Sequence, residues 1–274
     1  MSKTTLIKGA GWAIVWDAGA KRHAYRRGAD IAFAGDRLTY VGERYEGKAD
    51  TTIDGRGLLV MPGLINLHIH SSNQMAYKGV REDHGTPEHQ MTGLYERMQA
   101  FVISAAGKKA ATELAYIELV QGGVTTVMDL TGDYPGWIET VAASGMRAYL
   151  APQFASARWY MDNPQEVKFA WDERAGRQQF EAALALSDEI ERHASDRLSP
   201  VVFPAQIDTV SEDLFRDAIS VAARTGRMMT THIAQSVVEF REMIRRTGMS
   251  PVQWAGSIGL LGPRTVLGHS IFVD

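Results

Sequence analysis

The pattern of hydrophobic and polar positions changes character near Pro62. Before it, short apolar runs are broken by glycine-containing turns, and none of them shows a helical period. Gly35-Asp36 joins two of these runs, which is a hairpin signature. Short strands with tight turns favour part of a small β-sandwich domain over residues 1–60.

After Pro62, strand-like apolar runs alternate with amphipathic helical patterns. One helical pattern begins after Ser211, a candidate N-cap that precedes two acidic residues. The alternation predicts βαβ units and a parallel sheet over residues 61–274. The six strand candidates are residues 64–70, 124–129, 147–151, 201–204, 228–232 and 265–269.

Six parallel strands fit either an open doubly wound sheet or part of an eight-stranded barrel. A nucleotide-dependent enzyme on an open sheet usually carries a glycine-rich phosphate loop, G-x-G-x-x-G, after a strand. No such motif follows any of the six runs, so this class is disfavoured.

Composition narrows the functional classes. Hydrophobic residues make up 45% of the 274 residues and charged residues 22%, which is ordinary for a globular protein. The net charge of −3 gives no basic field for nucleic acid or an anionic membrane. No apolar run is long enough for a signal peptide or a membrane span, so we expect a soluble cytoplasmic protein.

The chain has no cysteine, which excludes disulfides and thiolate metal sites. Any transition-metal site must therefore use histidine and carboxylate. Four of the eight histidines end strand-like runs, where functional side chains of βα folds gather. His68 and His70 project to the same side of one strand because residues i and i+2 share a face. His232 and His269 end two further runs.

The i, i+2 spacing alone is weak, because polar residues at strand ends are common. We expect surface or loop roles for the remaining four histidines, His23, His84, His89 and His193. The loop that holds His84 and His89 follows the first strand with histidines, and it could instead cover an active site.

Four segments resemble the amidohydrolase superfamily in order and spacing. TTIDGRGLLVMPGLINLHIH resembles the family signature in which Pro-Gly leads into His-x-His. QGGVTTVMD, THIAQS and LLGPRTVLGHSIFVD resemble the second, fifth and sixth barrel strands. The branch of the family that this sequence most resembles contains cytosine deaminases, guanine deaminases and triazine chlorohydrolases. The resemblance implies an α/β fold, an incomplete (β/α)8 TIM barrel with about six strands, preceded by part of a small β-sandwich.

The same resemblance implies a metal centre. His68, His70 and His232 would bind one divalent metal ion, zinc, with iron or cobalt as alternatives. His269 would be catalytic, as a hydrogen-bond partner of the metal's water or of the substrate. Three neutral imidazoles leave a coordination position open, where the metal lowers the pKa of water to about 7. The fourth strand, PVVFPAQ, lacks the lysine of binuclear members, which favours a single metal.

Gln235 departs from the family pattern. Many deaminases of this branch have glutamate three residues after the fifth-strand histidine, and it shuttles a proton. A neutral amide cannot relay a proton but can bind substrate. We therefore expect metal-dependent hydrolysis of an amide, urea, carbamate or thiocarbamate. Deamination or dechlorination of an N-heterocycle is the alternative, and a non-catalytic barrel scaffold is a second one, disfavoured by the intact histidine set.

The chain stops soon after the sixth strand. The family's seventh and eighth strands are missing, and so is the eighth-strand aspartate, because Asp274 falls too early. We expect a fragment that is inactive alone and needs a C-terminal portion to complete the barrel. A homo-oligomer is expected for the whole protein. Asp129 ends the second strand and is interpreted as an anchor for a helix or loop.

Substrate contacts are expected from two segments. The segment after the first strand contributes Gln74. Arg158-Trp159-Tyr160 follows the third strand, and Trp159 and Tyr160 can stack on a flat small molecule. Both segments are also ordinary loop content.

Overall fold

A computed structural model describes residues 2–78, 95, 102–163 and 166–273. Within α1 it does not describe the side chains of residues 74, 76 and 77. Contacts between residues divide the chain into two compact units, Met1–Gly63 and Leu64–Asp274.

The N-terminal unit consists of two β-sheets over residues 2–63. One sheet has the order β5-β4-β1-β6 and the other the order β3-β2-β7. Their strands are β1 (Thr4–Ala10), β2 (Trp12–Asp17), β3 (Arg22–Arg26), β4 (Ala29–Ala34), β5 (Arg37–Gly42), β6 (Thr51–Asp54) and β7 (Leu59–Val60). The hairpin predicted at Gly35-Asp36 is confirmed, because β4 and β5 pair in antiparallel register. Ala10, Ala13 and Ile31 belong to a small buried cluster that both sheets share, so the unit is a sandwich.

The C-terminal unit is built on a curved parallel sheet, as the sequence predicts. In its described part the strand order is β16-β15-β14-β10-β9-β8, and every neighbouring pair is parallel. The strands are β8 (Leu64–Ile69), β9 (Val124–Asp129), β10 (Arg147–Leu150), β14 (Leu198–Pro204), β15 (Met228–Ile233) and β16 (Thr265–His269). All six expected strands are confirmed. The short β11 (Gln153–Phe154) adds to β14, and β12 (Ala157–Tyr160) pairs with β13 (Lys168–Trp171) in a hairpin that the sequence did not suggest.

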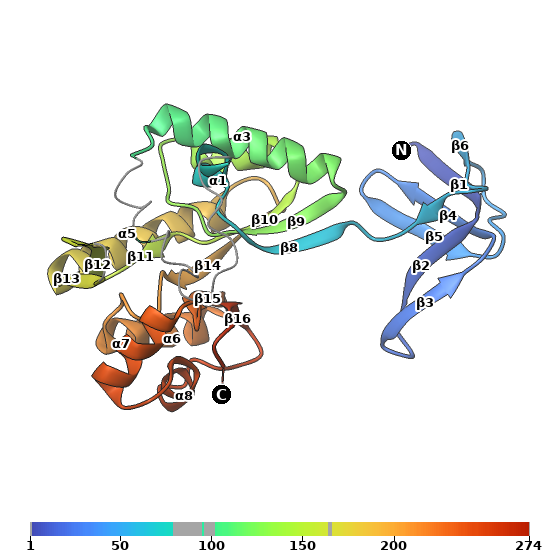
Figure 1. Ribbon diagram of the computed structural model, residues 1–274. Coiled ribbons are helices and arrows are strands. Elements are labelled where there is room, and N and C mark those ends of the chain that lie inside the picture. The colour runs from blue at the N-terminus through green and yellow to red at the C-terminus, as the bar shows by residue number, and fades with distance from the viewer. Residues whose placement is uncertain (1, 79–94, 96–101, 164–165, 274) are drawn as a thin grey trace. The chain divides into compact units, whose positions relative to one another are not determined.

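Helices connect the strands and lie around the outside of the sheet (Figure 1). They are α1 (Ser71–Tyr77), α3 (Ala105–Gln121), α4 (Trp137–Ala143), α5 (Glu173–Arg192), α6 (Glu212–Thr225), α7 (Val237–Thr247) and α8 (Pro251–Ser257). α6 begins at the predicted N-cap Ser211 and ends at Gly226, whose φ of +73° suits glycine. The Ser211 hydroxyl does not cap the first turn. It lies 3.2 Å from the Ser156 hydroxyl instead.

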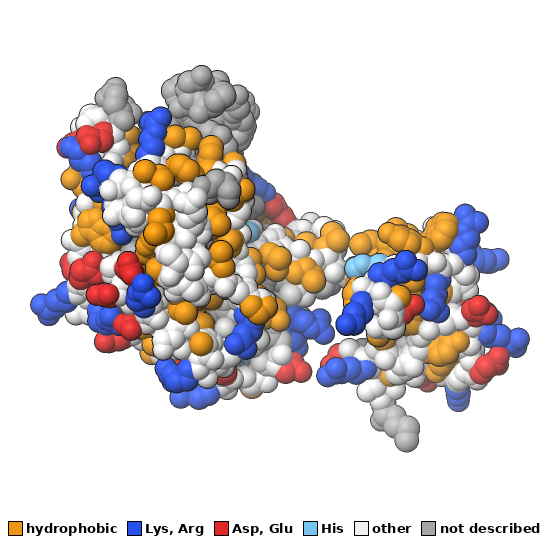
Figure 2. Space-filling view, turned by 90° about the horizontal axis from the view of Figure 1, so that it is seen from below, with side chains coloured by type: hydrophobic (Ala, Val, Ile, Leu, Met, Phe, Trp, Pro, Cys, Tyr) orange, Lys and Arg blue, Asp and Glu red, His pale blue; other side chains and the backbone are white. Residues whose placement is uncertain are grey.

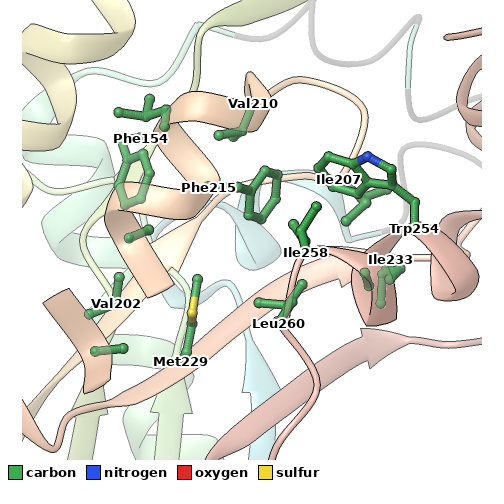
Figure 3. Packing of buried hydrophobic residues seen from close by; sticks show 14 of the residues in the cluster. Phe154, Val202, Ile207, Val210, Phe215, Met229, Ile233, Trp254, Ile258 and Leu260 are labelled. Carbon is green, nitrogen blue, oxygen red and sulfur yellow. The ribbon is translucent and has the colours of Figure 1, made fainter. Parts of the chain in front are cut away.

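The largest buried cluster packs α6 and α8 against β14 and β15. Phe215 of α6 lies near its centre, with Phe154 on one side and Trp254 on the other (Figure 3). The rings of Phe215 and Trp254 meet edge to face at 5.4 Å. This packing fixes the carboxyl ends of β14 and β15, and His232 lies at the second of them.

The two edge strands, β8 and β16, approach each other at their carboxyl ends. A Cβ placed on Gly268 of β16 would lie 2.9 Å from Cε1 of His68 on β8. The sheet is therefore curled into a nearly closed barrel, which confirms the predicted α/β barrel class.

The surface of the barrel unit carries acidic and basic side chains interspersed, on the face shown in Figure 2. Hydrophobic side chains are exposed along β8, including Leu64, Ile65 and Leu67. Among the described residues, no helix combines the length and the apolar character needed to cross a membrane.

Candidate metal centre

Four histidines meet at the carboxyl end of the sheet. His68 lies on β8, His70 directly follows that strand, and His232 and His269 lie on β15 and β16. In parallel sheets these strand ends face the same rim, which is why residues so distant in sequence meet. One ring nitrogen from each of His68, His70 and His232 lies within 4.8 Å of the others.

The spacing of the ring nitrogens suits a metal ion. Nε2 of His70 lies 3.2 Å from Nε2 of His68 and 3.1 Å from Nε2 of His232. Two nitrogens bound to tetrahedral zinc at about 2.05 Å would be about 3.3 Å apart. The observed separations are close to that edge length.

Backbone carbonyls set the tautomers of two of these rings. His70 Nδ1 lies 2.8 Å from the Leu130 carbonyl oxygen, and His232 Nδ1 lies 2.6 Å from that of Ala205. A carbonyl only accepts, so each Nδ1 carries the proton and donates it. The two Nε2 atoms then face each other with lone pairs, which repel unless a cation lies between them. These residues therefore fit a bound divalent metal.

The histidine rings are also held in the neutral form that binds metal. Burial, followed by the charges of His70 and His269, lowers the pKa of His68 to about 4. Burial likewise lowers the pKa of His70, and it holds the pKa of His232 well below its ordinary value. Protons therefore compete weakly for this site near neutral pH.

Asp129 anchors the turn that carries His70. Its fully buried carboxylate accepts hydrogen bonds from the hydroxyls of Ser71, at 2.6 Å, of Thr131, and of Tyr116, at 3.1 Å. Ser71 follows His70, and Thr131 follows Leu130, whose carbonyl binds the His70 ring. Burial raises the pKa of Asp129, and these donors oppose that rise. The carboxylate thus connects both sides of the His70 turn.

Gln235 and Gln206 lie beside His232. Gln235 Nε2 donates to Gln206 Oε1 at 3.0 Å, and Gln206 forms a β-bridge with His232. Gln235 is buried, and its backbone N–H donates to Glu239 Oε2 at 3.2 Å. The sequence did not single out Gln206 or Glu239.

A buried acidic pair lies behind this turn. Burial is the main cause that raises the pKa of Asp208 to about 7 and that of Glu239 to about 8, and the charge of Asp208 contributes to the second shift. Trp159 Nε1 donates to Asp208 Oδ2 at 3.0 Å. Tyr95 packs edge to face on Trp159 at 4.8 Å, and its hydroxyl pairs with that of Ser236 at 2.8 Å.

A cleft of about 890 Å³ reaches two neighbours of His232. Trp159 and Tyr160 of β12 line it together with Ala205 and Gln206, two of the residues that contact His232. Trp159 is half-buried and fixed by Asp208, so it forms a rigid wall. The aromatic residues singled out in the sequence therefore face a space that reaches the neighbours of His232.

The remaining sequence candidates lie elsewhere. Gln74 falls in α1 with its side chain outside the described part, and His84, His89 and Asp274 lie outside the described residues. His23 is exposed on β3. His193 ends α5 and lies 3.3 Å from Glu139. Neither His23 nor His193 belongs to the centre.

Residues 59–274 match the sequence profile of the amidohydrolase family. A 5-methylthioadenosine/S-adenosylhomocysteine deaminase of Thermococcus kodakarensis is 26% identical over 246 residues, which are 90% of this chain and 54% of the relative. The chain therefore spans about half the length of that relative.

Two solved structures share the fold. An atrazine chlorohydrolase of Arthrobacter aurescens, solved with zinc, superposes with a TM-score of 0.79 at 20% identity, over 98% of this chain and 61% of its own. An adenosine deaminase of Xanthomonas campestris, also solved with zinc, superposes with a TM-score of 0.77 at 20% identity, over 98% of this chain and 58% of its own.

Proposed function

Because the chain belongs to the amidohydrolase family, we propose that it forms the metal-binding part of a hydrolase that cleaves a C–N or related bond of a small molecule. The metal ligands are His68, His70 and His232, and the ion is zinc. One observation carries the proposal: two Nε2 lone pairs face each other at 3.1 Å while both Nδ1 protons are held by carbonyls.

The chain's own residues supply the rest of the chemistry. A bound metal would provide Lewis acidity and lower the pKa of a coordinated water towards about 7. His269 is the most open of the four histidines, and its ring lies 4.9 Å from that of His68 and 5.2 Å from that of His232. From there its imidazole can exchange a proton with the substrate or the leaving group.

Gln235 points to the class of bond. Its amide is engaged with Gln206 and carries no titratable proton. A substrate whose ring nitrogen must be protonated gains nothing from this residue. We therefore propose an amide, urea, carbamate or thiocarbamate as the bond cleaved, with Gln235 binding the substrate and Trp159 and Tyr160 stacking on it.

Deamination of an amino-heterocycle is the second candidate. The names of the relatives favour it, since the Thermococcus protein is a deaminase of adenosine derivatives and one structural neighbour is an adenosine deaminase. The cleft beside His232 has aromatic walls that suit a flat ring.

The test uses the whole protein loaded with zinc, against two substrate panels. One panel contains ureas and carbamates, and the other 5-methylthioadenosine, S-adenosylhomocysteine and aminotriazines. We expect turnover in the first panel, with Gln235→Glu giving no increase. Ammonia release from the second panel at about 1 s⁻¹ or more would make deamination the function.

The metal assignment has its own control. His232→Ala should lose both bound zinc and turnover, because one of the three metal-binding nitrogens is removed. His193→Ala removes a histidine that pairs with Glu139 on the outside of the barrel and should change neither. Full zinc occupancy in His232→Ala would refute the ligand set.

A further inference from the structure

The turn after β15 has a backbone conformation that its sequence does not favour. Ala234 has a φ of +54°, in the left-handed region that a side chain with a Cβ rarely adopts. It lies between His232 and Gln235, two residues of the proposed site. Something outside the turn must hold Ala234 in this conformation.

Glu239 provides that hold. Its carboxylate accepts the backbone N–H of Ala234 at one oxygen and the N–H of Gln235 at the other. Successive N–H groups beside a left-handed residue form a concave donor pair that binds anions. Glu239 is 0% exposed, so it fills this concavity without competition from solvent.

The helix that carries Glu239 is fixed to the same turn. Ser236 is the N-cap of α7, and its hydroxyl accepts from the Glu239 N–H at 3.0 Å. In the usual capping box the glutamate side chain returns to the N-cap N–H. Here it reaches further back, to the two residues before the cap.

The Ala234 turn also supports the segment after His269. The Ala234 carbonyl accepts the N–H of Ile271 and of Phe272, each at 3.0 Å, and the Ile233 carbonyl accepts that of Ser270 at 3.0 Å. His269 and Ser270 are themselves left-handed, with φ of +69° and +51°. A change in the Ala234 turn is therefore transmitted to His269.

We propose that Glu239 is a positioning residue. It holds the left-handed Ala234 turn and thereby fixes the positions of His232, Gln235 and His269 relative to one another. The proposal deepens the proposed metal-dependent function and rests on it, because these positions matter for catalysis only if the histidines bind a metal. Glu239 touches no reacting atom and acts through the backbone N–H groups of the turn and the side chain of Gln235.

The first test needs no substitution. In the ¹⁵N-labelled chain, the amides of Ala234 and Gln235 should exchange with solvent slowly, because both donate to a buried carboxylate. They should exchange at least about tenfold more slowly than amides of an unprotected loop. Exchange at the loop rate would overturn the proposal whatever the substrate is.

The second test compares Glu239→Gln with Glu242→Gln. The amide replaces one acceptor oxygen of Glu239 with an N–H group that faces another N–H, so one of the two hydrogen bonds is lost. Glu242 lies one turn further along α7, and its carboxylate accepts from Arg245 at 2.7 and 2.8 Å, with no hydrogen bond to the Ala234 turn among the described residues. It is the matched control for replacement of a largely buried glutamate by its amide.

We expect Glu239→Gln to weaken zinc binding about tenfold, the usual scale for a residue that orients a ligand. The visible spectrum of the cobalt-loaded protein should also change, because it reports ligand geometry. Glu242→Gln should leave both unchanged. An unaltered zinc affinity and cobalt spectrum in Glu239→Gln would refute the positioning role.

A rescue separates this role from general support of the fold. Glycine adopts positive φ without penalty, so Ala234→Gly should make the turn less dependent on Glu239. In the Glu239→Gln background it should recover about threefold in zinc affinity. No recovery would mean that Glu239 acts elsewhere. Absence of turnover on every substrate, with these results intact, would count against the proposed function and not against the positioning role.

Discussion

Two buried acidic side chains, Asp208 and Glu239, lie beside the proposed metal site. Asp208 lies in the turn after β14 and Glu239 in the first turn of α7, and both are 0% exposed. Trp159 Nε1 donates to Asp208 Oδ2, and Oδ1 has no hydrogen-bond partner among the described residues. Ionisation of Asp208 is therefore unfavourable in the folded protein.

This predicts a pH dependence of stability. A carboxyl group whose pKa is raised by folding stabilises the protein fully below its unfolded pKa, near about 4, and loses that contribution as pH rises through the folded pKa. For Asp208 the folded pKa is about 7. Other groups that face the pair are Glu242, Arg246 and Tyr95. Wild-type stability should therefore fall, relative to Asp208→Asn, between about pH 5 and pH 7.

The measurement is urea unfolding of both proteins with chelator present, which removes any effect of metal. The amide of the Asp208→Asn variant keeps an oxygen for Trp159 and also removes the repulsion on Glu239, so both effects have the same sign. Asp133→Asn, at an exposed position, is the control. A stability difference that stays constant from about pH 5 to pH 7 would mean that Asp208 is already ionised at the lower pH.

The sequence did not reveal several residues around the site, because their contacts leave no pattern along the chain. Glu239 binds backbone N–H groups, which every residue except proline carries, so its partners leave no pattern. Ser236 and Glu239 form the S-x-x-E signal of a capping box, which marks the helix start but not the longer reach to Ala234. Ala234 is alanine, so nothing in the sequence marks a left-handed turn. The Trp159–Asp208 contact joins residues 49 positions apart.

At the scale of elements, the close approach of β8 and β16 depends on Gly268. Gly268 pairs with His232 across β15 and β16, and a Cβ there would lie 2.9 and 3.1 Å from Cε1 and Nδ1 of His68. It would also lie 3.3 Å from the Thr231 carbonyl oxygen, which cannot move away easily. Absence of a side chain at this point lets the edge strands bring His68 to His232.

Gly268→Ala should therefore displace the His68 ring and weaken zinc binding by about tenfold or more. Competition with a chromophoric chelator measures the affinity. Gly256→Ala is the matched control, because a Cβ on Gly256 of α8 would meet only Leu261 Cδ1, at 3.6 Å. Equal zinc affinity in the two variants would show that the His68 ring can shift without cost to the site.

Elements were more predictable than their contacts. The six strands could be located because each is a short apolar run between turn residues, and the four histidines could be placed at strand ends by the same reading. Boundaries moved where tertiary pairing extended a strand: β14 begins at Leu198, and β15 runs on to Ile233. The β12–β13 hairpin was missed because its mixed polar sequence, with exposed Arg158 and Trp171, carries no clean alternation.

At the scale of the whole chain, the proposed ligands connect distant parts of one sheet. His68 and His70 come from the edge strand β8 or its end, and His232 comes from β15, next to the opposite edge. No strand pairing links β8 directly to β15 in the described residues. A metal bound by all three would therefore be a cross-link that the backbone hydrogen bonds do not supply. It belongs wholly to the unit Leu64–Asp274.

Zinc should consequently stabilise one unit and not the other. A ligand that binds only the folded state stabilises it by about 2.7 kcal/mol at a hundredfold excess over its Kd. Hydrogen exchange with and without zinc should show slower exchange in β8 and β15, and unchanged exchange in residues 2–63. His232→Ala should abolish the difference. Equal slowing in both units would show that they unfold together, and no slowing in β8 would show that His68 and His70 do not bind the metal.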